Sequence, residues 1–253
     1  MPAATVTGRI LTSPKILLNG YDMTGFHDKI SAPISQEELT PQQFGAVGKQ
    51  RMAGRDELTM THSGFWEAGT GKPETVLHGL NLLGVGGDVL SLCPNTGAEG
   101  EQGWFTQVNR LKYESGGKVG GMTAFSGAAY SFGEPILDGT ILKAATITAS
   151  GTGSGVVLGA VSATQSIYAV LHVTATSGNA NRTLDVIIES ADAADLVFAS
   201  PTTRMTFTQV TTAVSGEYLA PILGAVTDTR WRAKYTRGGT TGSFTMYVLF
   251  AIR

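Results

Sequence analysis

The sequence predicts a mainly β protein, with an N-terminal β-sandwich or barrel that carries one flanking helix and a C-terminal β-sandwich domain. Three observations predict this class. Glycine accounts for 33 of the 253 residues, roughly twice its usual share, and turns favour it. Short apolar stretches recur at near-regular spacing between Gly, Asn and Ser turns, as in sandwiches and barrels. Residues 73–83 are the one stretch where we expect a helix, because apolar side chains recur there at helical spacing.

The composition changes near residue 143. Residues 1–143 carry 11 basic and 14 acidic side chains, whereas residues 144–253 carry 7 and 6 and include 19 threonines. Threonine favours strands and is a poor helix former. The Gly/Ser/Thr stretch at 146–155 is typical of a connection between domains. We therefore expect two domains, at 1–143 and 144–253.

The N-terminal domain is expected to be mainly β. The Asn-Gly pair at 19–20 is a strong signal for a two-residue hairpin turn. Leu58, Met60 and His62 alternate with polar residues and so share one face of a strand. Pro73 suits a first helical turn, and the apolar stripe that follows indicates packing against a sheet. The expected strands are 15–18, 22–28, 55–65, 103–114 and 118–132.

The C-terminal domain is predicted to be all-β, because it contains no stretch with helical periodicity. Turn signals at 177–179 and 237–239 fall between apolar stretches. Short strands at such spacing predict a sandwich or barrel. The expected strands are 156–158, 167–176, 183–190, 205–210, 231–236 and 243–252.

Charge and motifs argue against several function classes. The net charge of -2 does not provide the basic face that generic nucleic-acid binding needs. Cys93 is the only cysteine, so a disulfide within the chain and a Cys-rich zinc site are excluded; we expect its thiol to be buried or idle. Phosphate-loop, dinucleotide, metalloprotease and serine-hydrolase motifs are absent. His172 lies in an apolar run and is expected to be a hydrogen-bonded histidine rather than a metal ligand. We therefore predict no catalytic, cofactor-binding or metal-binding residues.

Apolar runs in the sequence are short, such as 246–252, whereas a membrane helix needs about 20 such residues. The start of the chain lacks the pattern of a secretory signal. We expect a protein made in a reducing compartment that does not span a membrane.

The N-terminal part resembles the tail tube proteins, or major tail proteins, of long-tailed bacteriophages. The residues that carry the resemblance are an early strand pair, LNGYDMTGFHDKI, a long polar loop, QEELTPQQFGAVGKQRMAG, and the strand GRDELTMTHSGFWEAG. A short helix at 73–83 and returning strands at 104–114 and 118–132 complete the order of elements. The resemblance covers roughly residues 15–142. The C-terminal part, with LGAVSATQSIYAVLHV and GAVTDTRWRAKYT, resembles β-sandwich domains common in phage virion proteins.

This resemblance implies a subunit without enzymatic activity or cofactor. Copies would form rings that stack into a hollow tube, through which viral DNA passes into the host. The implied partners are other copies of the chain, the tape measure, tail terminator and distal tail proteins, and DNA in transit without specific binding. The implied location is the virion tail, after synthesis in the host bacterial cytoplasm. In the family the long loop reaches a neighbouring ring, which assigns assembly here to Pro41, Gln42, Gln43, Phe44, Gly45, Ala46, Val47, Gly48, Lys49, Gln50, Arg51 and Met52.

Several alternatives remain open at the level of sequence. If the C-terminal domain is an outward decoration, six copies are expected per ring. If it is a second tube-forming unit, three copies are expected. A different class of function is a virion or surface module that binds a receptor or glycan. Trp231, Tyr235, Phe244 and Tyr247 would then form a sugar platform, whereas the other interpretation is core packing. A hydrolase on a β scaffold comes last, because no acid/base pair stands out.

Overall fold

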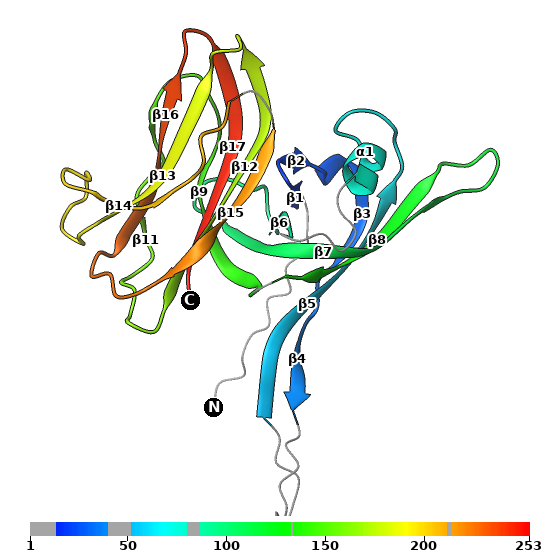
Figure 1. Ribbon diagram of the computed structural model, residues 1–253, viewed down its shortest axis with the longest axis horizontal. Coiled ribbons are helices and arrows are strands. Elements are labelled where there is room, and N and C mark those ends of the chain that lie inside the picture. Colours follow the sequence, from blue (N-terminus) through cyan, green and yellow to red (C-terminus); the bar gives the residue numbers. More distant parts are fainter. Residues whose placement is uncertain (1–13, 40–51, 80–86, 133, 212–213) are drawn as a thin grey trace, which may run out of the picture.

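The computed structural model of the chain describes residues 14–39, 52–79, 87–132, 134–211 and 214–253 (Figure 1). Antiparallel strands dominate these ranges, which confirms the mainly β class. The first nine strands are β1 Lys15–Leu18, β2 Tyr21–Asp22, β3 His27–Ser31, β4 Ile34–Leu39, β5 Met52–Phe65, β6 Asp88–Cys93, β7 Gln102–Gly116, β8 Ala124–Ser131 and β9 Ile136–Ile147. The remaining strands are β10 Gly151–Thr152, β11 Val156–Val157, β12 Ser166–Gly178, β13 Thr183–Ala191, β14 Thr202–Thr206, β15 Ser215–Leu223, β16 Arg230–Gly238 and β17 Gly242–Ile252. Two helical elements, the 3-10 helix η1 Thr24–Phe26 and the α-helix α1 Pro73–Gly79, accompany them.

The hairpin predicted at Asn19-Gly20 is confirmed. Both residues have positive φ, 47° and 83°, as a two-residue type I′ turn requires, and the turn joins β1 to β2. The strand expected at 22–28 is wrong, since β2 ends at Asp22 and η1 follows. Asp22 Oδ1 accepts a bond from the Thr24 N–H, and Thr24 Oγ1 accepts one from Ile16 N–H. These local bonds compete with the strand ladder and turn the chain.

Other expected elements differ at their ends. The strand expected at 118–132 begins only at Ala124. β14 ends at Thr206, before the expected end at 210, where Val210 forms an isolated bridge to Leu184. The last residues of the expected helix 73–83 lie outside the described residues. Strands β4, β6, β9, β10 and β15 were not among the expected elements. The first residues of the expected polar loop, 36–39, are wrong, because they lie in β4 and pair with β5. β6 and the middle of β9 are buried on both faces and so lack the alternation that marks a half-buried strand.

The strands form two sheets. Twelve strands make the larger sheet, whose central order is β15-β12-β17-β9-β7-β6-β1-β2, with β8, β5, β3 and β4 attached through β7. β7 holds this sheet together, because its first part pairs with β6 and β9 and its second part pairs with β8. The smaller sheet has the order β10-β16-β13-β14, with β11 also beside β16. It packs on the β15-β12-β17-β9 end of the larger sheet and makes the C-terminal β-sandwich.

Three apolar clusters fill the interior. One lies in the sandwich and includes Trp231, which stacks on Phe250 at a ring-centroid distance of 4.7 Å. A second lies between α1 and the N-terminal strands and contains Val76 and Leu77 of the helix. The third contains Phe105 and residues of β9, β12 and β17, so it belongs to both parts of the chain. Position 143 falls inside β9, which pairs with β7 on one side and β17 on the other. The division into domains at 1–143 and 144–253 stays a prediction.

His172 lies at the joint between the two parts, and its hydrogen bonding in the core is as predicted. The imidazole is fully buried; Nδ1 accepts a bond from Gly20 N–H (3.2 Å) and Nε2 lies 2.9 Å from Ser91 Oγ. Since Nδ1 accepts, the neutral ring donates its Nε2–H to the serine. Burial lowers the pKa of His172 to about 3. His172 thereby connects β12 of the sandwich by hydrogen bonds to the β1–β2 turn and to β6 of the N-terminal part.

Candidate assembly surfaces

The ribbon of β4 and β5 projects from the body of the molecule (Figure 1). β4 pairs with β5 alone, in a register that runs from Ile34↔Leu58 to Leu39↔Met52. Of the residues predicted to mediate stacking, Pro41 to Arg51 lie outside the described residues, and Met52 is the first residue of β5. Leu39 and Met52, the described residues that flank the stretch 40–51, pair at the far end of the ribbon.

The sheet of β3, β5, β8 and β7 has two unlike faces. Its inner face packs under α1 and includes Met60, Phe125 and Ala129. On its outer face, cross-strand neighbours bring short side chains together, as in the row Ser63↔Ser126. An open depression lies over this face. Its lining includes Thr61, Ser63, Ser126 and Ala128. The lining of this depression is rich in hydroxyls, whereas Phe65, further along β5 on the same face, is 45% exposed.

Charges on the outer face balance. Lys29 and Lys112 border the depression, and Asp28 and Glu114 border the adjoining one. Lys112 Nζ is paired with Glu114 Oε1 at 2.8 Å. Four charges of alternating sign give no excess of positive charge, so the face does not attract phosphates in the way that a basic groove would.

Two histidines lie beneath this face. His27 Nδ1 donates to Met23 O (2.9 Å), so His27 Nε2 in the neutral ring accepts from His62 Nδ1 at 2.9 Å. Burial keeps the pKa of His27 below its ordinary value. The His27 ring is therefore neutral at neutral pH and adds no positive charge under the outer face.

The β7–β8 hairpin ends in a defined turn, which we call the arm tip (residues 117–123). Gly121 N–H donates to Lys118 O at 2.9 Å, and Gly120 has φ of 83°, as the third position of a type II turn requires. Val119 at the second position is fully exposed, and Met122 is 72% exposed. The arm tip thus presents two apolar side chains to solvent.

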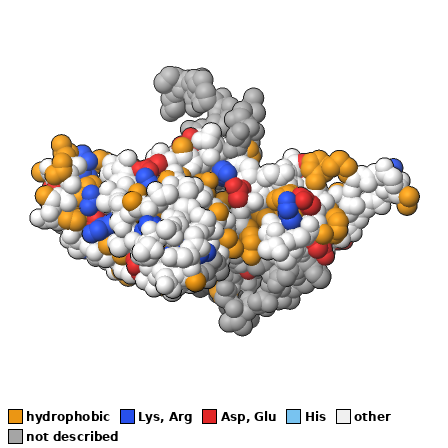
Figure 2. Space-filling model, turned by 90° about the horizontal axis from the view of Figure 1, so that it is seen from above, with side chains coloured by type: hydrophobic (Ala, Val, Ile, Leu, Met, Phe, Trp, Pro, Cys, Tyr) orange, Lys and Arg blue, Asp and Glu red, His pale blue; other side chains and the backbone are white. Residues whose placement is uncertain are grey.

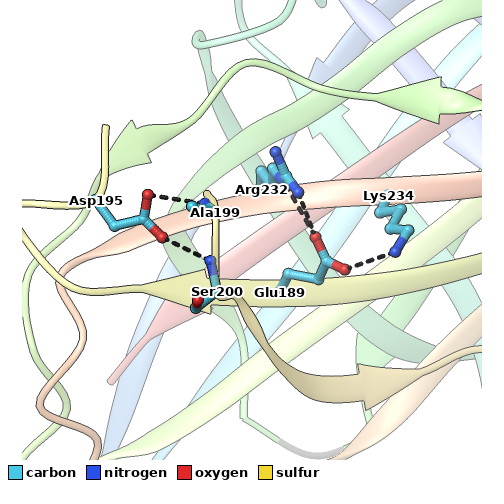
Figure 3. Close-up of polar contacts among 6 residues, drawn as sticks. All are labelled: Glu189, Asp195, Ala199, Ser200, Arg232 and Lys234. Atoms are coloured by element: carbon cyan, nitrogen blue, oxygen red, sulfur yellow. Dashed lines mark hydrogen bonds and ion pairs between the residues drawn. The ribbon is translucent and has the colours of Figure 1, made fainter. Parts of the chain in front are cut away.

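The connection between β13 and β14, which we call the braced loop (residues 192–201), is held by its own side chains. The Asp195 carboxylate accepts bonds from Ala199 N–H (2.8 Å) and Ser200 N–H (3.1 Å), which lower its pKa (Figure 3). Phe198 has a positive φ of 54°, and its ring is buried below the Arg232 guanidinium at 4.2 Å. A strained, buried aromatic fixes the loop from within.

Two aliphatic side chains stand on the outside of the braced loop. Leu196 is 65% exposed and Val197 is 77% exposed. Neither these residues nor those of the arm tip were among the predicted site residues. The Gly-Gly pair in KVGGM is a turn signal that could have placed Val119 at an exposed tip. Nothing comparable marks Leu196 and Val197, because their exposure depends on the burial of Phe198.

Next to the braced loop, Glu189 forms a buried ion cluster. Its side chain is 3% exposed and accepts two bonds from Arg232 (2.9 and 2.8 Å), and its other oxygen lies 3.2 Å from Lys234 Nζ (Figure 3). A buried carboxylate needs such partners, because leaving it unpaired would be strongly destabilising. The cluster holds Arg232 over Phe198 and so has a structural role.

The remaining candidates from the sequence are accounted for by packing. Trp231 and Phe244 are fully buried in the sandwich, and Tyr235 and Tyr247 are half-buried against the clusters, so the core-packing interpretation is confirmed. Cys93 is buried, and burial raises the pKa of its thiol to about 12, which confirms an idle thiol. Among the described residues no group of three or more His, Cys, Asp or Glu could hold a metal ion. No helix in these ranges is long and apolar enough to cross a membrane.

No family model and no curated protein sequence matches this chain. It is similar to a chain in the virion of a native gene transfer agent particle, with 12% identity over 51% of this chain and 98% of that chain and a TM-score of 0.38. It is similar to a chain of the extended PVC sheath–tube complex, an extracellular contractile injection system, with 10% identity, 52% and 92% coverage and a TM-score of 0.40. It is also similar to the SPP1 Dit protein, of the hub adsorption apparatus in phages infecting Gram-positive hosts, with 10% identity, 95% and 99% coverage and a TM-score of 0.33. Such low TM-scores establish no shared function.

Proposed function

We propose that the chain is a structural subunit of a phage-type tail tube, in which copies join into rings and the rings stack into a conduit for DNA. The observation that carries this proposal is the β4–β5 ribbon. A two-stranded ribbon that leaves the body of a sheet protein buries little of its own surface and is marginal alone. Contacts with a neighbouring copy would stabilise the ribbon, and the described residues on either side of 40–51, Leu39 and Met52, lie at its far end.

Ring formation is supported by the open edges of the large sheet. On the side of β7 that faces away from β8, residues 109–112 and 114–116 pair with no described strand. An unpaired edge presents a row of N–H and C=O groups that another chain can extend. Joined edges would give a continuous wall between subunits, and backbone bonds of this kind do not depend on surface charge.

The outer face of β3, β5, β8 and β7 is the proposed lumen surface. It bears hydroxyls and no excess of basic side chains among those that border its depressions, so DNA would pass without specific binding. The proposal includes a location in the virion tail after synthesis in the host cytoplasm, and partners among the other tail proteins, namely the tape measure, tail terminator and distal tail proteins. It assigns the chain no enzymatic activity and no cofactor.

Negative-stain microscopy and light scattering of the purified chain test this function. We expect rings or tubes, and tubes should survive about 1 M salt, where the Debye length is near 3 Å. Replacing residues 41–50 by Asn-Gly should leave rings that no longer stack. A matched variant with ten Gly and Ser residues at 41–50 keeps the length of the segment but removes its side chains. Stacking by this variant would show that the length of the segment is sufficient for stacking.

Two outcomes would contradict the proposal. If both loop variants stack like the unmodified chain, the loop has no role in stacking. If the unmodified chain gives discrete particles that bind glycans and neither rings nor tubes, the protein is a receptor- or glycan-binding module instead.

A further inference from the structure

We propose that the contact between neighbouring copies in a ring is head-to-tail, with the arm tip of one copy packed on the braced loop of the next. This inference rests on the proposed self-assembly and adds a side-chain contact to the proposed joining of sheet edges. The two surfaces lie at opposite ends of the long axis: the β7–β8 hairpin ends at one side of Figure 1 and the β13–β14 connection at the other. Figure 2 shows hydrophobic side chains at both of these ends.

Each surface is apolar where a contact would be centred. Val119 and Met122 at the arm tip, and Leu196 and Val197 on the braced loop, are among the most exposed large hydrophobic residues of the described chain. Exposed apolar groups gathered at a projection are a common sign of a contact surface. Burying them against each other removes all four side chains from water.

Both surfaces are also preorganised. The arm tip has its turn bond and a glycine at the position that requires positive φ. In the braced loop, Asp195 fixes two N–H groups and the Phe198 ring is held under Arg232. Because neither surface must be ordered on contact, less conformational entropy is lost when copies associate.

Charge decides which surfaces meet. The arm tip carries Lys118 and no acidic residue, whereas the braced loop carries Asp192 and Asp195 and no basic residue. Arg230 borders the loop and donates to Ala193 O, and Arg232 and Lys234 flank Glu189 beside it, so the acidic excess is confined to the loop itself. Tip-to-tip or loop-to-loop contacts would therefore place like charges together, and the tip-to-loop contact places opposite charges together.

A contact between two different surfaces repeats from copy to copy and closes into a ring where the rotation allows it. The braced loop belongs to the C-terminal sandwich. That sandwich is then part of the ring wall and is not an outward decoration. The outer edge of β15 is a poor competitor for this contact, because Pro221 lacks the N–H that a continuous ladder needs.

Disulfide trapping in the full-length chain tests the pairing. Val119→Cys and Val197→Cys are made separately, and Cys93 stays in place because it is buried. Oxidising a mixture of the two variants should give a covalent dimer, whereas each variant alone should give none. A disulfide in either variant alone would show tip-to-tip or loop-to-loop contact and would overturn the proposal.

Assembly of polar variants gives a second readout. Val119→Ser with Met122→Ser, or Leu196→Ser with Val197→Ser, should raise the concentration needed for ring formation about tenfold or more. Leu223→Ser is the matched control, since Leu223 is 67% exposed but lies outside both surfaces; it should have no effect. If the unmodified chain forms rings and the double variants do so equally well, the head-to-tail contact is wrong and the tube function stands. If the unmodified chain forms no rings or tubes, the proposed function fails and this contact fails with it.

Discussion

Replacing His172 tests the joint between the two parts of the chain, and it predicts how stability depends on pH. The imidazole is fully buried and satisfies Gly20 N–H and Ser91 Oγ in its neutral form. Burial lowers its pKa to about 3, from an ordinary value of 6.5. Because the folded-state pKa lies below the unfolded-state pKa, the contribution of this group is complete above pH 6.5 and is lost as the pH falls toward 3.

Inside this window each pH unit removes about 1.4 kcal/mol of unfolding free energy, or about 2 kcal/mol between roughly pH 6.5 and 5.0. His172→Gln should be about 1–3 kcal/mol less stable than the unmodified chain at neutral pH, because it disturbs two buried bonds. The slope of its unfolding free energy against pH should be smaller than that of the unmodified chain by about 1.4 kcal/mol per pH unit. Urea unfolding of the monomeric subunit across this range measures both quantities.

Ser91→Ala is the matched control for this experiment. It removes one hydrogen-bond partner and leaves the imidazole in place, so it should lower stability while keeping the pH slope of the unmodified chain. Carboxyl groups such as Asp22, whose pKa is lowered in the fold, lose their contribution only at more acidic pH. If His172→Gln kept the slope of the unmodified chain, the reasoning from a buried neutral imidazole would be refuted.

Trp231→Ala should lower the unfolding free energy by roughly 3–5 kcal/mol, because the ring is fully buried, and an unchanged urea midpoint would contradict this. Gly20→Ala should lower Tm, because Gly20 has a φ of 83° and no room for a Cβ beside the backbone of Ser215; Gly25→Ala, which has open space, should leave Tm nearly unchanged. The predicted domain 144–253 should melt at a lower temperature by circular dichroism than a fragment of residues 134–253, because it lacks most of β9. Equal Tm values for the two fragments would contradict a contribution of β9 to the sandwich.

Local sequence patterns were sufficient to predict many elements of the fold. The Asn-Gly pair determined the first hairpin, because few other pairs adopt positive φ at both turn positions. Alternation placed Leu58, Met60 and His62 on one face of β5, and all three are buried there. Pro73 marked the start of α1 correctly. These features depend on neighbours within a few residues, and such neighbours are visible in the sequence.

The tertiary structure decided what depends on distant partners. β6 and the Ile141-Leu142 pair of β9 are buried on both faces, which hides their alternation. Only the pairing of β9 with β7 and β17 shows that one sheet crosses position 143. The partners of His172 lie 152 and 81 residues away in sequence. Likewise, Val119 and Val197 face solvent at opposite ends of the molecule. Strand register places Val119 at a hairpin turn, and the burial of the Phe198 side chain turns Val197 outward. Sequence periodicity reports which face of an element is apolar; it carries no information about which other element covers that face, and that is set by long-range register and packing.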